Sequence, residues 1–248
     1  MKYNGNILLN QEIAPNIFKM IIQCAPVAQN AKVGQFVNVY TKDKALLLPR
    51  PISLCQFTND TITLLYTVVG TGTKEFSTYT TADTIKISKT LGKGFAPQNV
   101  KTHVIVGGGI GIAPLLALAE ELSAQNTNII AVLGYKDHQY LVDEFKSICN
   151  EVYVSTDKAT SGFTGNVVDL IKMKHISGDY FYACGPKPML KALSTHCTQK
   201  NIPVQVSMEE RMGCGYGACV GCNCKVNNKN QKVCKDGPVF LGSEVNWQ

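Results

Sequence analysis

Residues 210–234 read ERMGCGYGACVGCNCKVNNKNQKVC and contain the spacing Cys-x4-Cys-x2-Cys-x11-Cys at Cys214, Cys219, Cys222 and Cys234. The first three cysteines have the spacing of a plant-type [2Fe–2S] loop, and Cys234 can supply the fourth thiolate. The glycines at 213, 215, 217 and 221 suit a loop that wraps a cluster, because glycine tolerates positive φ and lets backbone N–H groups approach the sulfides. A [2Fe–2S] centre moves one electron at a time, so the segment predicts an electron carrier.

Two other uses of these cysteines are less consistent with the spacing. Structural zinc usually has two CxxC-like knuckles, and here only Cys219 and Cys222 form one. Disulfides would require an oxidising compartment. Cys224 is a fifth sulfur in the segment, one residue past Cys222 and too close to be a comfortable additional ligand. We interpret it as a buried free thiol, and it remains the main alternative in the ligand assignment.

The composition describes a chain with a substantial core and no large charged surface. It has 248 residues, 45% of them hydrophobic, and a formal net charge of +6. Lysine and arginine are scattered, which argues against a nucleic-acid partner. The N-terminal MKYNGNILLN lacks the apolar run of a signal peptide, and the longest apolar run, Val104–Ala119, is shorter than the ~20 residues that span a bilayer. We therefore expect a cytoplasmic protein with no membrane contact, in which thiols stay reduced.

The chain divides by pattern into three parts. Up to about residue 98, short β-rich runs alternate with turns, which predicts an antiparallel barrel. These runs are Asn6–Leu9, Ile17–Ile22, Phe36–Tyr40, Ile52–Phe57, Ile62–Val69 and Thr84–Ser88. From residue 99 strands alternate with helices, which predicts a parallel α/β sheet. The predicted strands are Thr102–Val106, Asn128–Leu133, Val152–Ser155, Tyr180–Ala183 and Val204–Val206, and the predicted helices are Ile112–Ser123, Gln139–Ile148, Gly165–Met173 and Lys187–Gln199. The cysteine-rich remainder has little periodicity, so we expect its fold to depend on the cluster.

A glycine-rich turn joins the first strand of the α/β part to its first helix. It contains Gly107, Gly108, Gly109 and Gly111, and the helix that follows offers free N–H groups to a pyrophosphate. Such turns also occur for purely steric reasons. Cys184 and Gly185 end a later strand of the same part, where ligands of open α/β sheets bind. Cys184 could approach a nicotinamide ring there, or it could be a small packed residue before a turn.

Two motifs in the barrel part are candidates for binding a phosphorylated cofactor. Arg50-Pro51-Ile52-Ser53 opens a predicted strand, where an arginine can pair with a phosphate and a serine hydroxyl can bond a flavin edge atom. Taken alone, the motif also fits a surface arginine and a turn serine. The segment from Gly70 to Lys74 follows another strand and opens a short helix, which makes it a second candidate phosphate nest.

These elements in this order resemble the ferredoxin–NADP reductase superfamily, and the whole chain resembles the electron-transfer subunits of NAD-dependent (type B) dihydroorotate dehydrogenases. The resemblance rests on RPIS at 50–53, YTVVGTGTKEFS at 66–77, LGKGF at 91–95, GGGIGIAPL at 107–115, ACGP at 183–186, EERMGCGYGACVGC at 209–222 and KVCKDGPVF at 232–240. It implies a flavin-binding β-barrel over residues 1–98, an NAD-binding α/β domain over 99–206 and a [2Fe–2S] module over 207–248.

The resemblance also implies the cofactors and their contacts. FAD contacts are implied at Arg50, Pro51, Ile52, Ser53, Leu65, Tyr66, Thr67, Gly72 and Thr73, and a [2Fe–2S] cluster is implied on Cys214, Cys219, Cys222 and Cys234. Relatives often carry a basic residue where this chain has Thr67, and another where it has Pro49. These departures bear on individual phosphate contacts.

The implied partner is an FMN-containing catalytic subunit that oxidises dihydroorotate to orotate in pyrimidine biosynthesis, in a heterotetramer with two of each chain. Electrons would pass from its FMN through the cluster and FAD to NAD+, with FAD converting between single electrons and hydride. No residue of this chain is then required as an acid or base.

Two other functions stay open. One is an NAD(P)H-dependent ferredoxin or sulfide reductase subunit of the same architecture, and the other is a non-catalytic iron–sulfur or zinc-binding interaction module. For the nucleotide itself, the second predicted α/β strand runs into Gly134–His138, which lacks the Ser and Arg with which NADP-specific relatives hold the 2′-phosphate. Lys136 could attract that phosphate but Asp137 would repel it, so we expect NAD(H) to be preferred.

Overall fold

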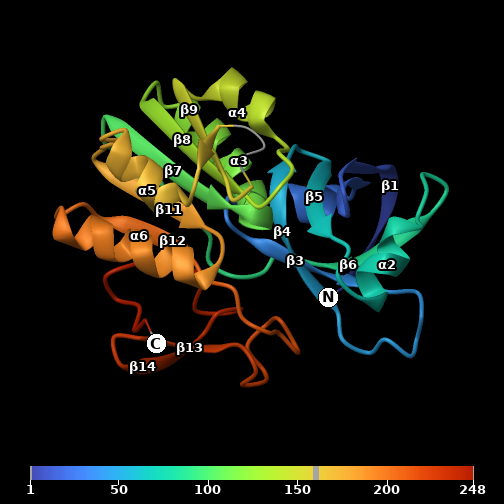
Figure 1. Cartoon of the computed structure of the whole chain (residues 1–248). Helices are drawn as coiled ribbons and strands as arrows, with labels where there is room; N and C mark the ends of the chain where they lie inside the picture. The colour runs from blue at the N-terminus through green and yellow to red at the C-terminus, as the bar shows by residue number, and fades with distance from the viewer. Residues whose placement is uncertain (1, 159–161, 248) are drawn as a thin grey trace.

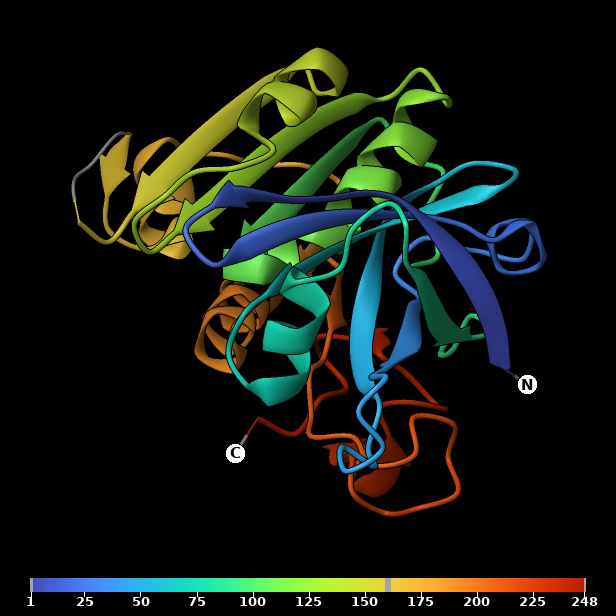
Figure 2. The same cartoon turned by 90° about the vertical axis from the view of Figure 1, so that its right-hand side faces the viewer.

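The computed structural model describes residues 2–158 and 162–247, which form a barrel, an α/β unit and a C-terminal module (Figure 1). The predicted fold class is confirmed. The module lies beneath the α/β unit in Figure 1 and below the body of the molecule in Figure 2.

The first unit is a closed antiparallel barrel in the order β1-β2-β5-β4-β3-β6. Its strands are β1 (Lys2–Ala14), β2 (Ile17–Gln23), β3 (Phe36–Tyr40), β4 (Arg50–Phe57), β5 (Thr61–Thr67) and β6 (Thr84–Ser88), and its helices are α1 (Ala25–Ala28) and α2 (Thr71–Ser77). In β3, Val37 and Val39 point into the barrel core, so Phe36 and Asn38 lie on its outer face. This alternation separates a packed interior from an outer surface that can hold a ligand.

The second unit is a sheet in the order β10-β9-β8-β7-β11-β12-β15, with helices on both faces (Figure 1). Its strands are β7 (Thr102–Gly108), β8 (Asn128–Tyr135), β9 (Glu151–Thr156), β10 (Phe163–Thr164), β11 (Tyr180–Cys184) and β12 (Val204–Ser207). Its helices are α3 (Ala113–Ser123), α4 (Val142–Ile148), α5 (Val167–Met173) and α6 (Lys187–Gln199). A 3-10 turn, η1 (Gly109–Ile112), joins β7 to α3, so the predicted helix begins one residue later than expected.

The last strand of this sheet comes from the C-terminal module. All pairings from β10 to β12 are parallel, but β15 (Val239–Leu241) pairs antiparallel with β12, Val206 lying opposite Phe240. The module also contains a hairpin of β13 (Asn223–Val226) and β14 (Lys229–Lys232). The backbone N–H of Lys93, in the segment that follows the barrel, donates to the Gly237 carbonyl at 2.6 Å. The module is therefore joined to both larger units.

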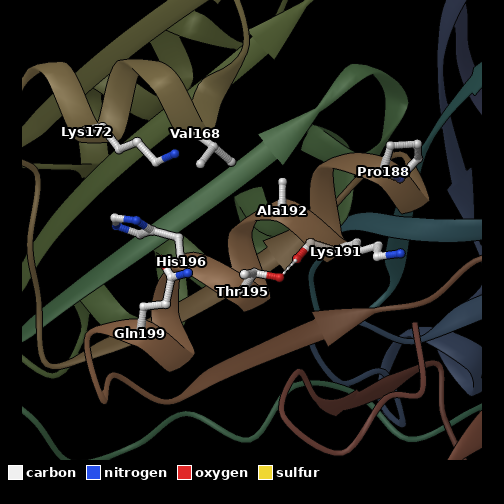
Figure 3. Close-up of a pocket in the computed structure, with 8 residues that line it drawn as sticks. All are labelled: Val168, Lys172, Pro188, Lys191, Ala192, Thr195, His196 and Gln199. Atoms are coloured by element: carbon white, nitrogen blue, oxygen red, sulfur yellow. Dashed lines mark hydrogen bonds between the residues drawn. The ribbon is translucent and has the colours of Figure 1, made fainter. Parts of the chain in front are cut away.

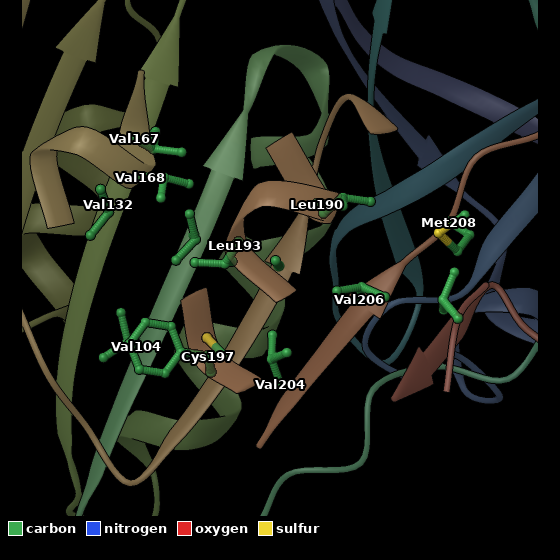
Figure 4. Close-up of a cluster of buried hydrophobic side chains, with 14 of the residues drawn as sticks. Val104, Val132, Val167, Val168, Leu190, Leu193, Cys197, Val204, Val206 and Met208 are labelled. Atoms are coloured by element: carbon green, nitrogen blue, oxygen red, sulfur yellow. The ribbon is translucent and has the colours of Figure 1, made fainter. Parts of the chain in front are cut away.

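One apolar core runs from the α/β unit into the module. Val104, Val132 and Leu193 pack between β7, β8 and α6, and the same cluster continues through Val206 to Met208 (Figure 4). It also includes the buried Cys222, Cys224 and Cys234. The cysteine segment thus packs on the sheet as part of a shared core. Over residues 2–158 and 162–247, no helix combines the length and apolarity required to cross a membrane.

Candidate functional site

A cavity of about 840 Å³ lies where the barrel, the α/β unit and the module meet. Its volume falls within the range of small-molecule and cofactor sites. Most of the predicted cofactor residues line it: Arg50, Pro51, Ile52, Ser53, Leu65, Tyr66, Thr67, Thr73, Gly111, Cys184 and Gly185. The structure therefore brings the two barrel motifs and the carboxyl ends of β7 and β11 to one place.

Arg50 is held at the start of β4 by its neighbours. Its Nη1 donates to the Leu48 carbonyl at 2.6 Å. A Cβ on Gly72 would lie 2.1 Å from Arg50 Nε, so a larger residue at this position would displace the guanidinium from its place beside α2. Thr73 fixes that turn, because its Oγ1 accepts from the backbone N–H groups of Val69 and Gly70 and donates to the Gly70 carbonyl. Gly72 is not among the residues that line the cavity, and it lies against the Arg50 guanidinium instead.

The glycines of the predicted nucleotide turn have different surroundings. A Cβ on Gly107 would lie 2.7 Å from Ile112 Cγ1, and one on Gly108 would lie 2.6 Å from Met189 Sδ, so both glycines lie in close contact with packed side chains. Gly109 has φ +54° and open space around it. Of the predicted set, Gly107, Gly108 and Gly109 do not line the cavity. Gly111 does, and its backbone lies against the Cys184 carbonyl.

Cys184 lies at the carboxyl end of β11, on the cavity wall. Burial raises the pKa of its thiol to about 12, although a hydrogen bond with Ser207 offsets part of this. The thiol is therefore neutral at physiological pH, and it presents a small uncharged group to the cavity.

Several cavity residues were not predicted from the sequence. They are Phe36, Leu48, Val69, Ile110, Ala113, Pro114, Ser207, Met208, Glu209, Glu210, Arg211, Met212 and Pro238. Many of them belong to the segment that precedes the first cysteine, and Glu210 forms a 3.8 Å ion pair with Lys187 at the start of α6. In the sequence, this segment was singled out only as the start of the motif EERMGCGYGACVGC at 209–222 and not as part of a cofactor site.

The four predicted cluster cysteines form two pairs in the structure. Cys214 Sγ accepts from the backbone N–H of Cys219 at 3.4 Å, and the two thiols also hydrogen-bond. Cys222 and Cys234, each 1% exposed, form the second pair through a side-chain hydrogen bond. The backbone N–H of Gly217 connects the pairs, because it donates to Cys234 from within the loop that carries Cys214 and Cys219.

The local electrostatics of the two pairs differ. Burial alone would raise the pKa of the Cys214 thiol, but hydrogen bonds from the backbone N–H groups of Cys219, Tyr216 and Ala218 lower it to about 6. Burial, together with the neighbouring Cys222, raises the pKa of Cys234 to about 12. The loop around Cys214 therefore favours a thiolate there, whereas burial favours the neutral thiol of Cys234.

This arrangement fits a two-iron group better than a single ion. Within the described part of the chain, no three His, Cys, Asp or Glu side chains gather closely enough to hold one metal ion. A single zinc draws all of its sulfurs to ~2.3 Å. A [2Fe–2S] cluster takes two thiolates on each iron, and two separate cysteine pairs match that requirement. Cys224 belongs to neither pair: it lies on β13 opposite Gln231, and burial raises the pKa of its thiol to about 11.

The end of β8 carries the residues predicted to govern nucleotide choice. Asp137 follows the strand, and its Oδ1 lies 2.9 Å from Lys158 Nζ. Hydrogen bonding with Lys158 lowers the pKa of Asp137, so the carboxylate is charged at neutral pH. The lysine paired with this carboxylate therefore comes from after β9, and it is Lys158 instead of the adjacent Lys136.

A second hollow, of about 440 Å³, lies between α5 and α6 (Figure 3). Lys172 and Val168 line it from α5, and Lys191, Thr195 and His196 line it from α6. Partial burial and the nearby Lys172 and Lys200 lower the pKa of His196. None of the predicted site residues lies here.

Family models match two parts of the chain. Residues 209–246 match the iron–sulfur cluster binding domain of dihydroorotate dehydrogenase B, and residues 105–195 match the oxidoreductase NAD-binding domain. The first match contains all four cysteines of the two pairs. The second match contains the glycine-rich turn and Cys184.

Curated relatives match the chain from end to end. The chain is 39% identical to a protein of Caldanaerobacter subterraneus subsp. tengcongensis, over 98% of each chain, and 40% identical to one of Geobacillus sp. (strain WCH70), over 96% of each. Both relatives are named "Dihydroorotate dehydrogenase B (NAD(+)), electron transfer subunit".

Solved structures share the fold. One, described as an NADH-dependent reduced ferredoxin-NADP oxidoreductase in a study of flavin-based electron bifurcation, superposes with a TM-score of 0.90 and 32% identity, covering 98% of this chain and 90% of that one. A ferredoxin NADP+ reductase from Neisseria gonorrhoeae superposes with a TM-score of 0.68 at 19% identity, covering 81% of this chain and 91% of that one, which shows the fold alone.

Proposed function

The chain belongs to the family of dihydroorotate dehydrogenase B (NAD(+)) electron transfer subunits, and we propose from this premise that it passes electrons from a catalytic partner subunit to NAD+. The observation that carries the proposal is that a paired-cysteine loop and a large cavity lie against one shared apolar core. Residues 208–212 line that cavity and lead directly into the first cysteine. A one-electron site and a flavin site would thus share a wall.

In this proposal, each cofactor has its own set of residues. Arg50, Pro51, Ile52, Ser53, Leu65, Tyr66, Thr67, Gly72 and Thr73 bind or shape the FAD site, and the cysteine pairs hold a [2Fe–2S] cluster. Gly107, Gly108, Gly109, Gly111, Cys184 and Gly185 form the NAD side. When bound, FAD exchanges hydride with nicotinamide and single electrons with an iron–sulfur centre. The chain itself supplies position, charge and exclusion of water, with no acid or base of its own.

The partner in this proposal is an FMN-containing subunit that oxidises dihydroorotate in pyrimidine biosynthesis, in a cytoplasmic heterotetramer of two of each chain. The names of the relatives support a partner, because an electron transfer subunit serves a catalytic one. The cysteine loop supports it too, since Tyr216 is 62% and Val220 is 70% exposed. Large apolar side chains beside a redox centre suit a protein contact. The same proposal divides the chain into three domains, with boundaries after residues 98 and 206.

One alternative has an observation in its favour. The solved structure that superposes with a TM-score of 0.90 at 32% identity is described as an NADH-dependent reduced ferredoxin-NADP oxidoreductase. A ferredoxin-linked subunit is therefore the second candidate. The full-length identity of about 40% to the named electron transfer subunits favours the first. A non-catalytic iron–sulfur or zinc-binding interaction module would leave the large cavity unexplained.

The deciding experiment is co-expression with an FMN-containing dihydroorotate-oxidising subunit. We expect the two chains to co-purify at equal stoichiometry with a mass of two of each, and the complex to reduce NAD+ with dihydroorotate. The isolated chain should be yellow with bound FAD and should lack dihydroorotate oxidation. NADH-dependent reduction of ferredoxin by the isolated chain, with no association between the two subunits, would establish the second candidate instead.

The cluster assignment gives the first prediction. Purified protein should contain two irons and two sulfides per chain, and replacing Cys214, Cys219, Cys222 or Cys234 by Ala should abolish iron retention, because each thiolate closes the coordination. Iron and sulfide analysis measures this. Cys224→Ala is the matched control from the same segment and should retain the cluster. Iron loss in Cys224→Ala, with retention in Cys222→Ala, would reverse the assignment.

A further inference from the structure

Asn38 lies on the outer face of the barrel between the cavity and the cysteine loop. In the β3–β4 pair it lies directly opposite Pro51, two residues along from Phe36, which lies opposite Ser53. Phe36, Pro51 and Ser53 all line the cavity. Directly opposite residues on one sheet face have Cβ atoms ~4.5–5.5 Å apart. Asn38 therefore continues the cavity face, although it is itself 1% exposed.

The Asn38 side chain contacts the cysteine loop directly. Its Nδ2 donates to the Cys214 carbonyl at 2.9 Å, across 176 residues of sequence. The next residue, Gly215, has φ +77°, and a Cβ there would lie 2.5 Å from Asn38 Nδ2 and 2.7 Å from Oδ1. The amide thus packs flat against the loop backbone, and glycine is what allows the close approach.

The barrel gives no reason for an amide at this position. Asn38 Oδ1 is buried and has no hydrogen-bond partner among the described residues. An unpaired buried acceptor is unfavourable, so an apolar side chain would serve packing better. The backbone N–H of Asn38 already donates to Ser88 Oγ at 2.9 Å, which ties the strand without the side chain. The remaining role of the amide is its bond to Cys214.

We propose that Asn38 is a positioning residue for the cluster. Its amide anchors the Cys214 peptide to the strand pair that forms the flavin cavity, and so fixes the first cysteine ligand relative to the flavin. The inference rests on the proposed function, since it takes Cys214 to be a cluster ligand. Residues that hold metal ligands from behind typically change metal affinity by ~10–100-fold when mutated, and hydrogen bonding around a cluster tunes its potential.

The test uses Asn38→Leu, which removes the amide at similar size, and Asn38→Asp, which keeps the shape but replaces the donor with an acceptor. We expect both full-length variants to bind FAD as the wild type does and to release iron to a chelator ~10–100-fold faster. The electron paramagnetic resonance spectrum of the reduced cluster should change. If Asn38→Leu does not fold, as shown by loss of FAD, Asn38→Asp decides alone.

The control is Ser88→Ala, which removes the hydrogen bond to the Asn38 backbone but leaves the amide in place. It should release iron at the wild-type rate. Wild-type iron release and spectra in the folded Asn38 variants would overturn the proposal, as would equal loosening in Ser88→Ala, which would indicate general weakening of the barrel. Wild-type protein that contains no iron would refute the cluster assignment itself, so the two failures are distinguishable.

Discussion

Arg50 lines the cavity, and its position depends on Gly72, which does not line it. Its guanidinium occupies space that any side chain at position 72 would fill. The Leu48 carbonyl also accepts a hydrogen bond from Arg50 Nη1. The arginine is therefore oriented before a ligand arrives. Orientation in advance reduces the entropy lost on binding, which matters for a long side chain.

The prediction at this residue concerns FAD affinity. Arg50→Ala should weaken FAD binding by about 1.5–3 kcal/mol, because it removes a charge-assisted hydrogen bond to a phosphate. Fluorescence titration of the apoprotein measures the change in Kd. Lys146→Ala, on the exposed surface of α4, controls for loss of one positive charge. Unchanged affinity in Arg50→Ala would show that the arginine does not contact the cofactor.

Sequence reasoning reached slightly less than half of the residues that line the cavity. The RPIS motif and the four cysteines are readable because their chemistry lies in adjacent residues or fixed spacings. Gly107 and Gly108 illustrate what the sequence does not distinguish. A glycine that packs closely against Ile112 or Met189 has the same sequence pattern as a glycine that contacts a phosphate. Asn38 had no signal at all, since its partner Cys214 is distant along the chain.

At the scale of elements, the end of β8 carries the prediction on nucleotide choice. Asp137 remains ionised beside Lys158, so a 2′-phosphate would meet a negative charge there. We expect a higher kcat/KM for NADH than for NADPH with an artificial electron acceptor. Asp137→Asn should narrow the preference by about fivefold, equivalent to the ~1 kcal/mol between unit charges at ~4 Å in water.

Steady-state kinetics with both nucleotides test this expectation. Asp143→Asn, at an exposed carboxylate on α4, is the matched control and should leave the ratio unchanged. A wild-type preference for NADPH would mean that Lys136 and Lys158 outweigh the carboxylate.

The elements themselves were predicted to different extents. β3, β6 and α6 have the predicted bounds, because periodicity and turn residues define them locally. α4 begins at Val142, three residues after the predicted start, because Leu141 adopts φ +61° and cannot be helical. β15 was not predicted: three residues in a loop become a strand only because the edge of β12 is present to pair with them.

Across the whole molecule, we expect segments with more backbone hydrogen bonds to be locally more stable. The loop around residues 213–222 has no regular secondary structure, whereas β15 is hydrogen-bonded to β12. Removal of iron should therefore leave residues 213–222 close to unprotected in hydrogen exchange, while β12 and β15 stay protected. Mass spectrometry of exchanged peptides measures this. Equal loss of protection in β15 would show that the cluster supports the sheet as well.

The antiparallel β15 also has a consequence for how the chain is made. β15 follows β12 along the chain, so a growing chain contains the buried strand Val204–Ser207 before the strand that covers its edge exists. Until then this edge offers unpaired N–H and C=O groups to any other strand, which is the usual route to aggregation. At the opposite edge β10 is only two residues long and offers little to pair with. Synthesis of Val239–Leu241 therefore covers the edge of the sheet that is more prone to pair with other strands, and a chain truncated before Val239 leaves that edge exposed.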